Sequence, residues 1–97
     1  MLETLALGHF ERLVGEQFAL RVDDSEVLPA VLVAARAGRG RRADGQPSFS
    51  LLFEGPPAPV LPQRIYEVAA PDSPMLEIFL VPVGRSPEGV HYEAIFS

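Results

Sequence analysis

Cysteine and lysine are both missing from this 97-residue sequence. Without cysteine the chain can form no disulfide bond, no thiolate nucleophile and no cysteine-ligated metal site. Long apolar runs are missing too, because no stretch approaches the ~20 apolar residues of a membrane-spanning helix. The first residues, 1–5, lack the basic region and the apolar run of a signal peptide. We therefore expect a cytoplasmic protein with no membrane contact.

The chain also has fewer basic residues than acidic ones. Arginine provides all eight basic residues against thirteen acidic residues, and the formal net charge is −5. Proteins that bind nucleic acid usually carry an excess of positive charge, because the release of counterions from the phosphates drives their affinity. The charge balance therefore predicts no nucleic-acid partner.

The remaining composition is that of a small folded domain. Hydrophobic residues make up 47% of the chain and charged residues 22%, which is typical of globular proteins rather than of disordered ones. A chain of this length has room for one hydrophobic core. We expect a single domain over residues 1–97, with a modest stability that further burial in an oligomer would increase.

Alternating apolar and polar residues predict most of the secondary structure. Ten prolines and eight glycines divide the chain into short segments, and a period of two within such segments is typical of strands joined by tight turns. The pattern predicts strands over residues 17–22, 48–54, 64–70, 75–83 and 90–96.

Two segments carry weaker patterns. Apolar residues at helical spacing before Gly15 predict a short helix within residues 8–15. Residues 27–36 combine alanines, which suit a helix, with Val31 and Val33, which suit a strand; we favour the strand and keep the helix as the alternative. The predicted fold is all-β with one short N-terminal helix, a small antiparallel barrel or sandwich of roughly six strands that ends in a C-terminal hairpin.

The two faces of this hairpin differ less in apolar content than expected for a sheet with one face in water. Aligning Leu80 with Tyr92 gathers the most apolar side chains on one face and leaves a loop over residues 84–88. The other face still carries four apolar residues, Phe79, Val81, Val83 and Ile95. A face open to water should alternate more cleanly. We expect it to be covered, by the same chain as the favoured option or by another subunit as the alternative, and these four residues form the candidate interaction surface.

An arginine cluster forms a second candidate. Its members are Arg36, Arg39, Arg41 and Arg42, interleaved with Gly38 and Gly40. Guanidinium groups bind phosphate and carboxylate well, but no strand–loop–helix context for a phosphate-binding loop is present. The pattern favours a solvated hairpin loop that runs to Pro47, and contact of this candidate anion-contact loop with an acidic partner is the alternative.

Catalytic and metal-binding patterns are not found. His9 and His91 do not stand at metal-ligand spacing, and no serine lies in a GxSxG elbow. The acidic cluster over residues 23–26 lacks the spacing of a calcium-binding loop and suits a turn. We therefore predict no catalytic residues, no metal and no cofactor, and expect that the protein is not an enzyme.

The proline-rich segment 55–64 has two interpretations. Pro59, Pro62 and Arg64 match the PxxPxR pattern of peptides that bind SH3-like grooves. Dense proline also stiffens a chain in extended geometry. We favour a stiff connector between two strands.

Several longer motifs resemble those of a known family. They are LALGHFE at 5–11, FSLLFEGP at 49–56, LPQRIY at 61–66, EIFLVPVGR at 77–85 and YEAIF at 92–96. The sequence is similar to a small bacterial domain family of unknown function over nearly its whole length, and the LVPVG type of motif is the most specific part. The resemblance supplies no catalytic residues. Members that occur near phage-tail-collar-like genes would imply a part in a fibre-like assembly.

Two functions follow as expectations. The first is a non-catalytic structural or adaptor protein that contacts a protein partner or itself through an apolar sheet face. The alternative is a small-ligand-binding β-barrel whose phenylalanine and tyrosine side chains line a pocket, so a small-molecule partner stays open.

Overall fold

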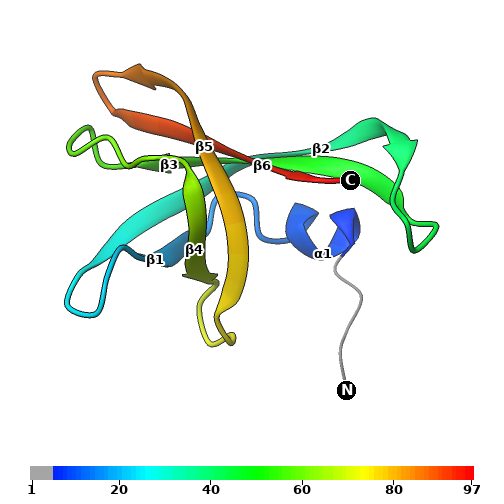
Figure 1. The fold of residues 1–97 in the computed structure, drawn as a ribbon, viewed down its shortest axis with the longest axis horizontal. Coiled ribbons are helices and arrows are strands. Elements are labelled where there is room, and N and C mark those ends of the chain that lie inside the picture. The colour runs from blue at the N-terminus through cyan, green and yellow to red at the C-terminus, as the bar shows by residue number, and fades with distance from the viewer. Residues whose placement is uncertain (1–5) are drawn as a thin grey trace.

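A computed structural model describes residues 6–97; the segment on which the signal-peptide expectation depends, 1–5, lies outside them. The elements are α1 (Leu7–Glu11), β1 (Gln17–Arg21), β2 (Val27–Arg41), β3 (Pro47–Gly55), β4 (Arg64–Ala69), β5 (Leu76–Ser86) and β6 (Gly89–Phe96) (Figure 1). The prediction of an all-β fold with one short N-terminal helix is confirmed, and residues 27–36 belong to a strand. In the part of the chain from residue 6 onward, no helix has the length and apolar character needed to span a bilayer.

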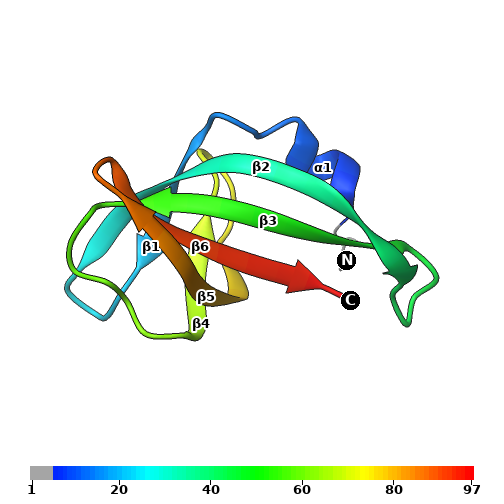
Figure 2. The same cartoon turned by 90° about the horizontal axis from the view of Figure 1, so that it is seen from above.

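The strands form a closed antiparallel barrel in the order β1-β2-β3-β6-β5-β4. β1, β2 and β3 make one up-and-down unit, and β4, β5 and β6 make a second (Figure 1, Figure 2). The pairs β3–β6 and β1–β4 join the two units into one ring. Closure gives the strands neighbours on both sides within the barrel, which removes the free edges of an open sheet.

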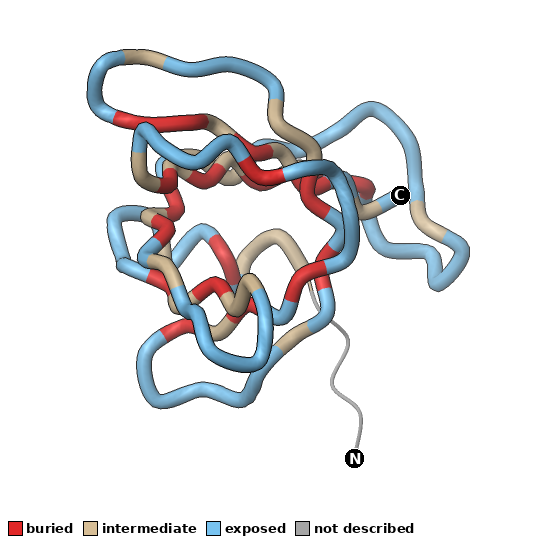
Figure 3. Tube along the Cα trace, turned by 60° about the vertical axis from the view of Figure 1, so that its left-hand side comes forward, coloured by how far each residue is buried: buried red, intermediate tan, exposed pale blue. Residues whose placement is uncertain are grey.

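Alternation along the strands places the large apolar side chains inside this ring. The fully buried set includes Phe18, Leu20, Leu32, Phe49, Leu51, Phe53, Tyr66, Val68, Leu80, Val90 and Tyr92. Phe18 meets Phe53 edge to face, with their ring centroids 5.2 Å apart, a geometry that aromatic pairs favour. The buried segments line the ring, whereas the loops that project from it are exposed (Figure 3).

The short helix α1 is held by one aromatic side chain. A helix of five residues is marginal on its own, but Phe10 is fully buried. Its ring centroid lies 5.7 Å from that of Phe49 and 5.7 Å from that of Phe96. After the helix, Gly15 has a φ of 96° and donates its N–H to the carbonyl oxygen of Leu32 at 2.7 Å. The helix therefore covers the core beneath β2 and β3.

The hairpin of β2 and β3 extends beyond the barrel, which corrects the prediction for the arginine cluster. Arg36, Arg39 and Arg41 lie on β2 rather than in a loop. Glycine here serves a close approach between strands, since a Cβ on Gly38 would lie 2.5 Å from Oγ of Ser48. The same hydroxyl accepts the N–H of Gly40 at 3.2 Å and donates to its carbonyl oxygen at 3.0 Å.

The predicted register of the C-terminal hairpin is wrong by two residues. Tyr92 pairs with Pro82 instead of Leu80, and a bulge separates Pro82 from Gly84. β5 runs on to Ser86 and β6 begins at Gly89, so both strands continue through part of the predicted loop. A bulge inserts an unpaired residue that sequence alternation does not reveal. A shift of two leaves every side chain on its predicted face.

The proline-rich segment is tied to the barrel by two tyrosines. The N–H of Leu61, which is buried, donates to the hydroxyl of Tyr92 at 2.9 Å. The hydroxyl of Tyr66 donates to the carbonyl oxygen of Pro62 at 2.5 Å. These bonds suit the connector interpretation, because they fix the path of the chain between β3 and β4.

Candidate functional site

A group of large apolar side chains faces outward from β4, β5 and β6. The exposed fractions are 51% for Phe79, 53% for Val83, 67% for Ile95 and 61% for Ile65, while Val81 is partly buried. We call these five residues the outer apolar patch. They alternate along the strands with core residues, so closing the barrel turns them toward solvent.

The strand register makes most of this patch continuous. Ile65 is the direct cross-strand partner of Phe79, and Val81 is two residues further along the same face of β5. Val81 pairs with Glu93, which makes Ile95 its diagonal neighbour. Direct partners have Cβ atoms about 5 Å apart and diagonal ones about 7 Å. Exposed apolar side chains gathered in this way commonly mark interaction sites.

The favoured expectation of cover from the same chain is wrong for this face. The one described helix, α1, packs against β2 and β3. The two halves of the barrel are joined edge to edge by the pairs β1–β4 and β3–β6, so neither half covers this face. Sequence reasoning found four members of the patch and missed Ile65. Its outward position follows from alternation with Tyr66, but its contact with Phe79 depends on the pairing of β4 with β5, which the sequence does not show.

Acidic groups border the patch on the β4–β5 side. Glu67 and Glu77 face each other across the two strands, an arrangement of like charges that is unfavourable unless a cation is near. Arg21 lies 3.6 Å from Oε1 of Glu67. Glu93 adds a further carboxylate beside Val81. We call Glu67 and Glu77 together the acidic end of the outer face.

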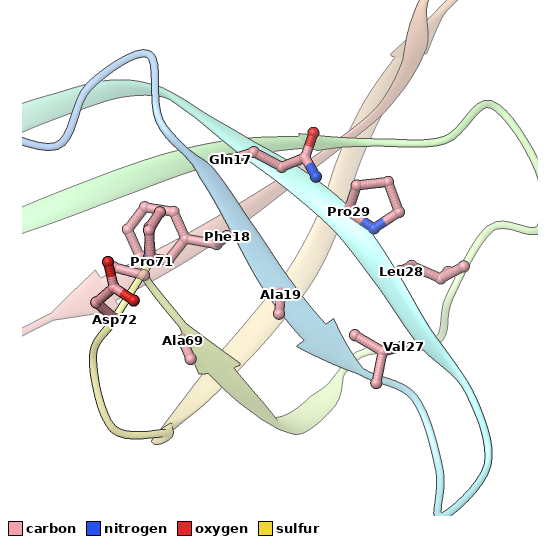
Figure 4. Close-up of a pocket in the computed structure, with 10 residues that line it drawn as sticks. Gln17, Phe18, Ala19, Val27, Leu28, Pro29, Ala69, Pro71 and Asp72 are labelled. Carbon is pink, nitrogen blue, oxygen red and sulfur yellow. The ribbon is translucent and has the colours of Figure 1, made fainter.

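The residues from 6 onward line hollows on the outside of the barrel, among them a smaller and a larger one. One, of about 230 Å³, is lined by charged residues that include Arg21, Asp23, Asp24, Arg64, Glu67 and Glu77. The other, of about 480 Å³, has small side chains at its base, where Ala19 pairs with Pro29 on one side and with Ala69 on the other (Figure 4). The second is open and largely apolar, with Gln17 and Asp72 among its lining residues. Most of the phenylalanine and tyrosine side chains expected to line a pocket are buried inside the barrel, although Phe18 also contributes to the larger hollow and Tyr66 to the smaller one.

The four arginines of the cluster differ in their surroundings. Arg42 is paired with Asp44 at 2.7 Å, and its guanidinium lies 5.6 Å from the ring centroid of Phe49. Arg41 donates to the carbonyl oxygen of Gly45 at 3.0 Å. Arg36 and Arg39 are exposed on β2. The hairpin tip therefore uses two arginines to shape its turn and presents the other two on its surface.

The two histidines and Tyr66 each contact another side chain or the backbone of the fold. His91 lies 2.9 Å from Glu54 on the outer face, and His9 packs edge-on against Phe10. Burial raises the pKa of the Tyr66 phenol, whose hydroxyl is already bonded to the connector. From residue 6 onward, no three histidine or acidic side chains gather in a way that could hold a metal ion.

The family assignment rests on a match over nearly the whole chain. A family model described as a domain of unknown function, DUF6916, matches residues 5–96. The chain is a DUF6916 domain. The match includes all six strands and every residue of the outer apolar patch and the arginine cluster. No curated protein and no solved structure matches the sequence.

Proposed function

We propose that this DUF6916 domain is a non-catalytic structural or adaptor protein that binds a protein partner through the outer apolar patch. The observation that carries the proposal is the exposure of Ile65, Phe79, Val83 and Ile95, each more than half open to solvent. The barrel fills its interior with other large side chains, so the fold does not need these four for its core. Removing them from water in a complex would be favourable in proportion to the apolar area covered.

The setting of this contact is also a proposal. We propose a small subunit of a fibre-like assembly in the bacterial cytoplasm, as members of the resembled family near phage-tail-collar-like genes would imply. A closed barrel with a projecting hairpin is compatible with such a part, since it offers a rigid body and a separate extension.

Site-specific photo-cross-linking in cells tests the contact. A benzophenone amino acid placed at Phe79 should form a covalent adduct with a protein, because this position lies in the middle of the patch. Val60, which is 47% exposed on the proline-rich connector, is the matched control and should give no adduct. Equal cross-linking at both positions, or none at Phe79, would contradict the proposal.

The ligand-binding alternative is supported by the hollow of about 480 Å³ on β1, β2 and β4. Its size falls within the range of small-molecule sites. Such sites are usually concave and enclose most of a ligand, and this hollow is open to solvent. It therefore gives the alternative less support than the outer apolar patch gives to protein binding.

A further inference from the structure

The outer part of β2 has an open edge. β1 pairs with β2 only as far as Val31, and the N–H and the carbonyl oxygen of Leu32 bond to the segment before β1. Within residues 6–97, the stretch 33–41 then has β3 on one side and no strand on the other. Both views show this part of the hairpin projecting beyond the barrel (Figure 1, Figure 2). Backbone N–H and C=O groups along such an edge are a template for pairing with another chain.

Small side chains leave this edge accessible. Residues 33–41 include three alanines and two glycines, and every residue from 36 to 41 is exposed. The helix α1 packs through Phe10 against Phe49, but in the described structure no backbone hydrogen bond joins the helix to this stretch. An additional extended segment can therefore approach the backbone of β2 from the open side.

The same edge is positively charged in an otherwise acidic protein. Residues 36–46, which we call the basic arm, contain four arginines and one aspartate, a formal charge of +3. The net charge of −5 leaves −8 for the rest of the chain. Arg36 and Arg39 are exposed, and none of the ion pairs described within residues 6–97 includes either of them. Guanidinium groups bind carboxylates through paired hydrogen bonds, so the arm is complementary to an acidic partner.

Charge also decides between the chains that could add to this edge. Two copies of this chain paired edge to edge would bring their basic arms together, and like charges on adjacent strands are unfavourable. A nucleic acid would meet the arginines, but it has no use for the row of backbone groups, and the charge of −8 on the rest of the chain would repel its phosphates. An extended acidic peptide satisfies both the backbone groups and the arginines.

We propose that the open edge of β2 over residues 33–41 binds an extended acidic segment of another protein by strand addition. Main-chain hydrogen bonds provide the pairing in this mode of recognition, and side-chain contacts provide the specificity. Arg36 and Arg39 supply that specificity by pairing with carboxylates of the added strand. The inference goes beyond the proposed function, because this edge is separate from the outer apolar patch on β4, β5 and β6.

Peptides of opposite charge test the preference for an acidic partner. The acidic probe is a fluorescently labelled peptide of alternating glutamate and valine, blocked at both ends, and the control peptide has lysine in place of glutamate. In fluorescence anisotropy the wild-type chain should bind the acidic probe at least about tenfold more tightly than the control peptide. The double variant Arg36→Glu/Arg39→Glu should reverse this preference, because it reverses the charge of the edge.

Single variants locate the contact on the arm. Arg36→Glu and Arg39→Glu should each weaken binding of the acidic probe by about fivefold or more. Arg85→Glu makes the same change in net charge at an exposed position on the β5–β6 hairpin, whose turn lies at the opposite end of the molecule (Figure 2). At physiological ionic strength this control should change the affinity by less than about twofold, since exposed charges beyond about 8 Å are screened.

Amide hydrogen exchange distinguishes strand addition from contact by charge alone. Backbone groups of a strand point to alternate sides, so the acidic probe should slow exchange at alternating positions within residues 33–41. Unchanged exchange over this stretch, or equal binding of the two peptides by the wild-type chain, would overturn the inference. A labelled thymidine oligonucleotide that binds more tightly than the acidic probe, and loses this affinity in Arg36→Glu, would overturn it in favour of nucleic acid. Circular dichroism checks the folding of each variant, and where Arg36→Glu does not fold, Arg39→Glu decides.

Discussion

Gly89 lies where the β5–β6 turn passes over the end of β3. A Cβ at this position would be 2.1 Å from the carbonyl oxygen of Gly55 and 2.9 Å from Cγ of Glu54. Backbone atoms cannot move away as the end of a flexible side chain can, so only glycine fits between these strands. The close approach lets β6 begin directly beside Gly55 and closes that corner of the barrel.

The substitution Gly89→Ala should therefore lower the free energy of unfolding by about 1–3 kcal/mol or more, as overpacking does. Urea denaturation followed by circular dichroism measures the change. Gly84→Ala is the matched control on the same hairpin, because a Cβ there would meet no atom within 4 Å. The control should change the stability by less than about 0.5 kcal/mol. Equal losses for the two variants would mean that the contact at Gly55 is not the cause.

At the scale of elements, the β1–β2 turn is organised by one carboxylate. Oδ1 of Asp23 accepts the N–H of Ser25 at 2.8 Å, the N–H of Glu26 at 2.9 Å and the hydroxyl of Ser25 at 3.0 Å. The backbone hydrogen bond from Ser25, with the other two bonds, holds the pKa of Asp23 below its usual range. The acidic cluster over residues 23–26 thus acts as a turn in the described structure, as the sequence favoured.

This turn should contribute to stability only while Asp23 is ionised. Because its pKa is lower in the folded state, the contribution is present above the unfolded pKa of about 3.9 and is lost as the pH falls through the folded value. Thermal unfolding should show Asp23→Ala to be less stable than the wild type at pH 7 and more nearly equal to it near pH 2. Asp24→Ala, with the same change in charge, is the control. A difference between wild type and Asp23→Ala that is constant over this range would contradict the assignment.

Strand β5 carries neighbouring residues with opposite roles. Leu80 is fully buried and Phe79 is 51% exposed, because successive side chains of a strand point to opposite faces. Leu80→Ala should therefore cost about 2–5 kcal/mol of unfolding free energy. Phe79→Ala should cost less than about 1 kcal/mol in the monomer, although it removes more atoms. Chemical denaturation at low protein concentration compares the two, and a larger loss at Phe79 would show that the faces are assigned the wrong way round.

At the scale of the whole molecule, the sequence predicted which face of a strand each side chain lies on better than it predicted which strands and residues pair. The outward position of Phe79 and the inward position of Leu80 follow from alternation alone, and they survive the register error because a shift of two residues preserves the face. The bulge at Pro82 and Gly84 and the pairing of β1 with β4 depend on contacts between distant segments. Local alternation carries no information about either.

The candidate site shows the same limit. Phe79, Val81, Val83 and Ile95 were found as an apolar surplus, but whether the chain itself covers them depends on how the barrel closes. Interleaved glycines at residues 38 and 40 predicted a loop, because glycine is common in loops. In the structure Gly38 makes room for Ser48 of the adjacent strand, a reason that appears only when both strands are in place.

The extension of β2 beyond the barrel also bears on aggregation. Its partner β1 pairs with residues only as far as Val31, and the segment before β1 bonds to Leu32. Within residues 6–97, the following part of β2 has no strand on that side, so it presents backbone groups on which further chains could add. Arg36 and Arg39 lie along this stretch, and charged residues on an edge discourage such growth. Arg36 and Arg39 would thereby protect the molecule from open-ended sheet formation.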